Sequence, residues 1–241
     1  GTKFSTRVWV SVVGIASIFF GSKGYADTVI SVADFGLKPD TRENAVAYVQ
    51  KAIEACRGKE PVTLVFPEGR YDFWPQYAHE KNYYETNTYD VFPKRLAMLF
   101  EGLHNITVDG SGSQFVMHDR IQPITVENCD GVTLKNFSID WDIPLTAQAR
   151  VTKVGSDFFE IEINVLESPY IIEDGKLVFV GEGWKSALGS MIEFESDTHF
   201  VVPGTGDLVL GWNWGDYTAV SPRYGIVRLS RKGGFERYPA E

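Results

Sequence analysis

The chain has 241 residues and a formal net charge of -9. This acidic balance argues against nucleic-acid binding, which needs a basic stripe, and it disfavours polyanionic substrates such as pectate unless a metal or a local basic patch intervenes. The length suits one domain and a second small one. The 16 Phe, 11 Tyr, 6 Trp and 23 Gly residues are typical of a β-rich protein with many turns.

The first 26 residues have the pattern of a secretory signal peptide. Lys3 and Arg7 give a basic start, and an apolar run of residues 8–20 follows. Ala26 supplies the small residue expected before the cleavage point. The apolar run is shorter than the ~20 residues that a membrane span needs. We therefore expect a secreted or periplasmic protein without a membrane span after cleavage of residues 1–26.

A strand, a helix and a second strand are predicted next, at residues 29–32, 42–57 and 62–66. Apolar residues recur at helical spacing in the middle segment, where Asp40 or Thr41 is the expected N-cap and Gly58 the expected C′ residue. Cys56 and Cys129 lack metal-site spacing and are expected to be free buried thiols.

Two octets that begin at Leu103 and Cys129 match in pattern at a distance of 26 residues. Ile106 aligns with Val132, and Val108 aligns with Leu134. A short strand with inward apolar residues, flanked by Asn, Asp and Gly turns and repeated at this spacing, indicates one coil of a right-handed parallel β-helix. We expect an N-terminal cap and the first coils in residues 27–144.

Two other segments depart from this pattern. Residues 72–95 are rich in aromatic side chains without a regular period, and this loop is expected either to stack on a sugar or to pack on itself. After Pro144 the strands alternate and are joined by turns such as Asp174-Gly175, which is typical of antiparallel hairpins. Residues 145–241 are therefore predicted to form an antiparallel β-barrel-like subdomain, inserted or appended.

Asp140, Trp141 and Asp142 are the candidate substrate-binding residues. If Phe137–Trp141 is a strand, Asp140 and Asp142 share one face, and the rise of about 3.3 Å per residue sets them about 6.6 Å apart. That separation suits an inverting glycosidase pair, but polar surface at a domain junction explains the two residues as well. His118 is expected to be a turn or surface residue. The spacing of the His and acidic residues predicts no metal site and no cofactor.

The N-terminal pattern, Asp34-Phe35-Gly36 followed later by Phe66-Pro67-Glu68-Gly69, resembles the cap of secreted β-helix enzymes such as polygalacturonases and pectate-lyase-like proteins. Together with the Gly110–Ser113 turn, the residues 138–144 and the hairpins after them, it resembles the N-terminal part of the bacterial α-1,3-galactosidases of glycoside hydrolase family 110.

The resemblance implies a secreted enzyme that releases terminal α-1,3-linked galactose from glycans with inversion and without a metal. It also implies that the catalytic acid and base lie beyond residue 241, so no catalytic residue is assigned. We expect this chain to be the N-terminal portion of a longer protein. Two alternatives stay open: another β-helix enzyme, active on pectin, and a non-catalytic secreted carbohydrate-binding module.

Overall fold

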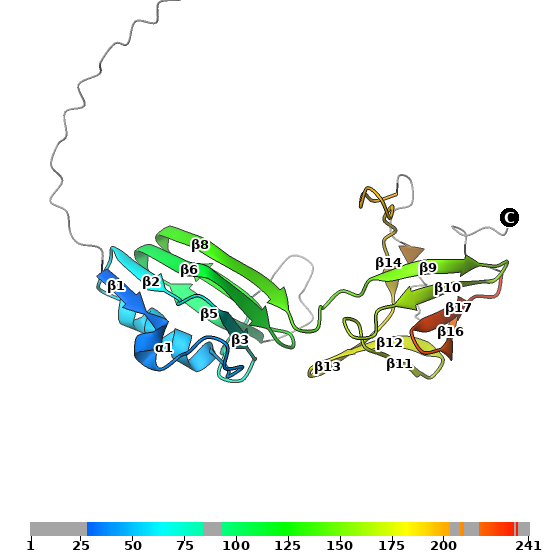
Figure 1. Ribbon diagram of the computed structural model, residues 1–241, viewed down its shortest axis with the longest axis horizontal. Helices are drawn as coiled ribbons and strands as arrows, with labels where there is room; N and C mark the ends of the chain where they lie inside the picture. The colour runs from blue at the N-terminus through cyan, green and yellow to red at the C-terminus, as the bar shows by residue number, and fades with distance from the viewer. Residues whose placement is uncertain (1–27, 84–92, 203–207, 210–216, 234, 236–241) are drawn as a thin grey trace, which may run out of the picture.

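The computed structural model describes residues 28–83, 93–202, 208–209, 217–233 and 235. The predicted signal peptide and the middle of the aromatic segment, residues 84–92, lie outside the described residues. Figure 1 shows two bodies joined by one passage of the chain after strand β8. Strands make up most of both bodies, as the sequence predicts. The described helices are limited to one short 3₁₀ turn and one α-helix.

The N-terminal body consists mainly of parallel strands covered at one side by a helix, and among the described strands of this body only β4 is antiparallel to its neighbour β5. The largest sheet has the order β1-β2-β6-β3, with β8 also paired to β6, and all of these pairings are parallel. A smaller sheet has the order β4-β5-β7. The elements are β1 Thr28–Ser31, η1 Val32–Phe35, α1 Val46–Cys56, β2 Val62–Val65, β3 Arg70–Phe73, β4 His79–Lys81, β5 Lys94–Glu101, β6 His104–Met117, β7 Gln122–Glu127 and β8 Asp130–Trp141.

The register of β6 and β8 confirms the 26-residue alignment of the two octets. Ile106 is paired with Val132 and Val108 with Leu134. The register shifts between Asp109 and Ser113, where the chain bends at the predicted turn. These pairings establish stacked parallel strands at the predicted spacing.

Helix α1 starts later than predicted, because the expected cap residues have other roles. Asp40 has a φ of 62° and its carboxylate accepts a hydrogen bond of 3.0 Å from the backbone N–H of Arg70. Thr41 accepts from the backbone N–H of Glu43, still ahead of the helix. The prediction of Asp40 or Thr41 as the N-cap is therefore wrong. At the other end, Gly58 has the positive φ expected of a C′ residue.

The helix covers a core in which large side chains interlock. Val46, Val49, Ala52, Ile53 and Cys56 are the residues of α1 that it buries. They join a cluster with the inward side chains of β2, β3, β5 and β6. Cys56 and Cys129 are both free, as predicted, although Cys129 is only half-buried. Burial raises the pKa of the Cys56 thiol to about 11.

The C-terminal body is antiparallel. Its largest sheet has the order β16-β17-β10-β9, and a second has the order β11-β12-β13. The Asp174-Gly175 turn between β11 and β12 has φ values of 50° and 71°, so this predicted hairpin is confirmed. The strands are β9 Ala149–Val154, β10 Phe158–Ile163, β11 Tyr170–Glu173, β12 Lys176–Gly181, β13 Trp184–Ala187, β14 Ser190–Met191, β15 Leu208–Val209, β16 Thr218–Arg223 and β17 Ile226–Ser230.

The alternating pattern predicts strands at residues 190–194 and 200–202, and the structure has less than this. Strand β14 covers only Ser190–Met191, and an isolated bridge joins Phe194 to Val201. Both bridge residues are exposed and lie outside the buried cluster of this body, so alternation here does not mark a buried face. Across the described residues, which start at Thr28, no helix is long and apolar enough to cross a membrane.

Candidate functional site

A hollow of about 330 Å³ lies beside the stacked strands. It is built on β6 and β8 and bordered by the first residue of β3. Neighbouring strands are in register here, with Arg70 beside Gln114 and Gln114 beside Ser138. Since alternate residues of a strand share a face, polar side chains from three strands collect on one wall. The lining residues are Arg70, Gln114, Phe115, Val116, Ser138, Ile139, Asp140, Trp141 and Asp142.

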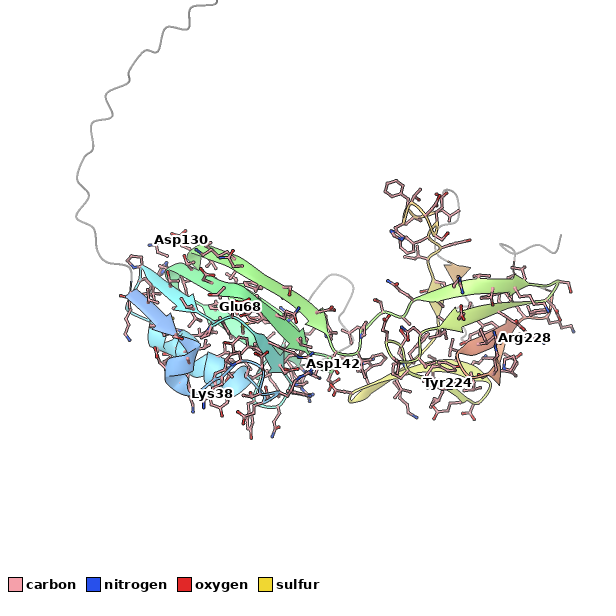
Figure 2. All side chains as sticks on the ribbon, in the orientation of Figure 1. Lys38, Glu68, Asp130, Asp142, Tyr224 and Arg228 are labelled. Atoms are coloured by element: carbon pink, nitrogen blue, oxygen red, sulfur yellow. The ribbon has the colours of Figure 1, made fainter. Side chains whose placement is uncertain are left out.

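All three predicted substrate-binding residues line this hollow. Asp140 is exposed, and its carboxylate accepts a hydrogen bond of 2.8 Å from the backbone N–H of Trp141. Asp142 follows the end of β8, and its backbone N–H donates to the carbonyl of Met117 at 3.0 Å. Figure 2 shows Asp142 at the end of the N-terminal body that faces the C-terminal body, with Asp130 at the opposite end.

Trp141 differs from the two aspartates in its packing. It is half-buried against the core of the N-terminal body. Its indole N–H donates to the backbone carbonyl of Asp119 at 3.3 Å. Trp141 therefore combines a packing role in the core with a place in the lining of the hollow.

Arg70 connects the hollow to a buried carboxylate. Its Nη2 donates to Asp142 at 2.8 Å and to Asp72 at 2.6 Å, and its Nε donates to Asp72 at 3.0 Å. Arg42 lies 3.8 Å from Asp142 and 3.7 Å from Asp72. The hydrogen bond to Asp72 is the main cause that raises the pKa of Arg70, so the guanidinium stays charged.

Asp72 is 1% exposed and is the centre of this network. Its Oδ1 also accepts a hydrogen bond of 2.9 Å from Nε2 of His118. Burial is the largest single influence on its ionisation and acts to raise the pKa. The hydrogen bonds from Arg70 and His118 together outweigh burial and hold the pKa of Asp72 below its ordinary value. Asp72 is thus a carboxylate that fixes Arg70 at the edge of the hollow.

His118 is the second residue whose role the sequence did not reveal. It was expected in a turn or at the surface, but it is 3% exposed and stacks on Trp74, with ring centroids 3.7 Å apart. That expectation is wrong, because the ring is held by Asp72 and Trp74 on one side of the sequence and by Glu182 far along the chain. Trp74 belongs to the predicted aromatic loop, and in this part the loop packs on the protein itself.

Aligning the strands could have found Arg70 and Asp72, which alternate on β3 as Ser138 and Asp140 do on β8. The two octets cover only the first half of β6 and of β8. The pairing of Gln114 with Ser138, which follows the shift in register, was therefore not visible in them. Among the residues that the structure describes, no group of three or more His, Cys, Asp or Glu side chains is arranged to hold a metal ion.

Comparison with known proteins identifies relatives of the chain. Residues 147–241 match the family model described as GLAA-B beta-barrel domain I. The chain is 56% identical over 217 residues to an "Alpha-1,3-galactosidase B" of Bacteroides thetaiotaomicron, covering 89% of this chain and 35% of that relative. The chain is homologous to the α-1,3-galactosidases. The resemblance predicted from the sequence is thus confirmed.

More distant relatives carry related names. An "Alpha-1,3-galactosidase A" of Shewanella woodyi is 36% identical over 69% of this chain and 28% of its own length. An "Alpha-1,3-galactosidase B" of Phocaeicola vulgatus is 36% identical over 83% of this chain and 32% of its own length. The chain spans about a third of the length of the curated relatives it matches.

Proposed function

We propose that the full-length protein is a glycosidase that releases terminal α-1,3-linked galactose from galactose-terminated glycans. The observation that carries this proposal is the 56% identity over 89% of the chain to a protein named α-1,3-galactosidase B. Because the chain covers only 35% of that relative, the activity is assigned to the whole protein and not to this part of it.

The hollow on β6 and β8 is proposed as part of the sugar-binding surface. It presents an amide from Gln114, a hydroxyl from Ser138 and the carboxylates of Asp140 and Asp142. These groups can accept and donate hydrogen bonds to sugar hydroxyls. A volume of about 330 Å³ is in the range of small-ligand sites.

The proposed reaction is an inverting hydrolysis by two carboxyl groups. A carboxylic acid protonates the leaving oxygen, while a carboxylate activates a water on the opposite face of the ring. The family resemblance implies that both groups follow residue 241. Asp140 and Asp142 are then assigned to sugar binding at the edge of the site, and Asp142 already pairs with Arg70.

We also propose that the stacked strands are the first coils of a parallel β-helix. The support is the parallel pairing of β2, β6 and β8, with a 26-residue offset between β6 and β8 at Ile106 and Val132. In such a fold each coil repeats the wall of the coil before it. Further coils would extend the wall that carries the hollow.

Secretion belongs to the same proposal. Its support is the basic start, apolar run and small residue at position 26 in the sequence. Amino-terminal sequencing of protein from the expressing bacterium should find a mature chain that begins at Asp27. A mature chain that keeps residues 1–26 would contradict the signal-peptide assignment.

The decisive experiment is an activity assay of the full-length protein on a galactose-α-1,3-galactose disaccharide. We expect release of free galactose, and proton NMR at early times should show the β-anomer as the first product. Release of the α-anomer would exclude an inverting mechanism but would still support the proposed galactosidase activity. Binding of the disaccharide without any hydrolysis would favour the carbohydrate-binding module instead.

A further inference from the structure

Two turns, one from each body, contact one another beside the hollow. Residues 118–120 follow β6 in the N-terminal body, and residues 182–183 join β12 to β13, which begins at Trp184, in the C-terminal body. A Cβ placed on Gly183 would lie 2.4 Å from the carboxylate of Asp119, and the Arg120 guanidinium lies 5.7 Å from the centre of the Trp184 ring. The two bodies therefore touch through side chains as well as through the connecting segment.

His118 lies at the centre of this contact, between two carboxylates. Its Nε2 is 2.9 Å from Oδ1 of Asp72 in the N-terminal body, and its Nδ1 is 2.6 Å from Oε2 of Glu182 in the C-terminal body. An ionised carboxylate is only an acceptor, so each ring nitrogen must donate a proton to make both hydrogen bonds. A neutral imidazole has one N–H, and only the imidazolium has two.

Charged groups from both bodies surround the ring. Asp72 on β3 is held ionised, although it shares its charge with Arg70 and lies near Arg42. Glu182 supplies a carboxylate from the other body. The adjacent Asp119 and Arg120, of opposite charge, lie on the same turn as His118.

The remaining face of the ring is covered by Trp74. The two rings are nearly parallel, 13° apart, and an aromatic face attracts a cation. His118 is 3% exposed, so water cannot readily replace a hydrogen bond that the ring loses. The Glu182 side chain, at 40% exposure, can instead move into solvent.

We propose that His118 is a proton-dependent clasp that holds the two bodies together while its ring is charged and releases Glu182 when the ring becomes neutral. Loss of a proton leaves one N–H for two carboxylates, and the buried Asp72 retains it. The Nδ1 lone pair then faces the Glu182 carboxylate, and the two repel. Closing takes up a proton, so the clasp is stable at low pH and weakens as the pH rises. This inference is independent of the proposed galactosidase activity.

The test is the distance between the two bodies as a function of pH. Spin labels are placed on the full chain at Lys38 and Tyr224, which are exposed and belong to different bodies in Figure 2. Labels attached through a ketone-bearing unnatural amino acid leave Cys56 and Cys129 untouched. Double electron–electron resonance should give one narrow distance at about pH 5.5 and a second, broader population at about pH 8.5.

The ratio of open to closed forms should rise by at most about tenfold per pH unit, the limit for release of one proton. Glu182→Gln is the informative variant, because its amide can donate to an unprotonated Nδ1. The narrow distance should then persist at both pH values. Glu173→Gln is the matched control, since Glu173 pairs with Lys185 within the C-terminal body, and it should behave like the unmodified protein.

Removal of the clasp should open the molecule at both pH values. His118→Ala removes both hydrogen bonds of the clasp. Glu182→Ala removes the bond between the bodies at a half-exposed position, and it replaces His118→Ala as the test if that variant does not fold. A distance distribution that does not change between the two pH values in the unmodified protein would overturn the proposal. An unaltered pH response in Glu182→Gln would overturn it as well.

Discussion

Single residues decide how the outer wall of the N-terminal body is held. Asp72 is buried and accepts hydrogen bonds from both Arg70 and His118. Arg70 is the first residue of the same strand, β3, and His118 directly follows β6. An ionised carboxylate in such a place is stabilising only while its partners are present. Its substitution therefore tests the network more sharply than substitution of an exposed acid.

Asp72→Asn should lower the free energy of unfolding by about 2–4 kcal/mol, because it leaves the charge of Arg70 only partly compensated by Asp142. Urea unfolding followed by tryptophan fluorescence measures the change. Asp130→Asn, at an exposed position at the start of β8, is the matched control and should change the free energy by less than about 0.5 kcal/mol. Equal effects of the two substitutions would contradict the network.

The same carboxyl gives a pH dependence with a definite sign. Because the folded-state pKa of Asp72 is lowered, its contribution is present above the ordinary carboxyl value and is lost as the pH falls through the folded-state pKa. The difference in unfolding free energy between the unmodified protein and Asp72→Asn should shrink from about pH 6 to about pH 3. Urea midpoints measured across this range test it, and a difference that grows on acidification would refute the assignment.

Asp140 tests the proposed sugar site. In Asp140→Asn the amide oxygen can still accept from the Trp141 N–H, so the fold should be unchanged while the charge is lost. We expect kcat/KM on the disaccharide to fall about tenfold in the full-length enzyme, as for loss of one charged hydrogen bond. Unchanged kinetics at unchanged stability would return Asp140 to an ordinary surface position.

Elements of the N-terminal body depend on close approach between successive strands. Gly131, at the start of β8, has a φ of 70°, and a Cβ there would meet the side-chain oxygen of Asn105 at 2.7 Å. Gly58, after α1, has a φ of 73° with nothing within 4 Å of such a Cβ. The two glycines have nearly the same φ, and they differ in that only Gly131 has a neighbouring strand close to it.

Gly58→Ala should cost about 1–2 kcal/mol, the penalty of a left-handed conformation. Gly131→Ala should cost more, by roughly a further 1 kcal/mol, because the Asn105 side chain must also shift. Thermal unfolding of the two variants beside the unmodified protein gives the comparison. An identical loss in both would show that the strands are not packed as closely as the register of β6 and β8 requires.

At the scale of the elements, the sequence predicted the repeat of the strands correctly, but it did not predict where helix α1 begins. The 26-residue alignment was visible because Ile106 and Val132 have the same inward role in successive strands. The start of α1 was not visible, because Asp40 is bonded to a backbone group 30 residues away. A propensity for capping cannot reveal such a partner.

At the scale of the whole molecule the sequence anticipated the change from parallel to antiparallel strands, through turns such as Asp174-Gly175. It did not anticipate the contact between the bodies. His118 meets Asp72 over 46 residues and Glu182 over 64 residues of sequence. No local pattern links such positions, and a lone histidine has the same appearance in a turn as in a buried network.

Strand β8, the outer strand of the stack, has exposed apolar side chains that bear on the rest of the full-length protein. Residues of β8 that face the same way as the fully buried Ile106 and Val108 remain exposed, with Leu134 at 39% and Ile139 at 38%. The curated relatives named above are about two and a half times as long as this chain. An exposed apolar row on a strand with a free edge is ordinarily covered by another element.

We therefore expect β8 to be covered in the full-length protein by the polypeptide that follows. Hydrogen exchange of residues 130–141 should be at least about tenfold slower in the full-length protein than in the chain of residues 27–241, because covering adds the hydrogen bonds of a further strand. Strand β10 in the C-terminal body, already paired on both sides, serves as the internal reference and should exchange at the same rate in both. Equal exchange of β8 in the two proteins would mean that its edge stays open, and the proposed continuation of the β-helix would fail.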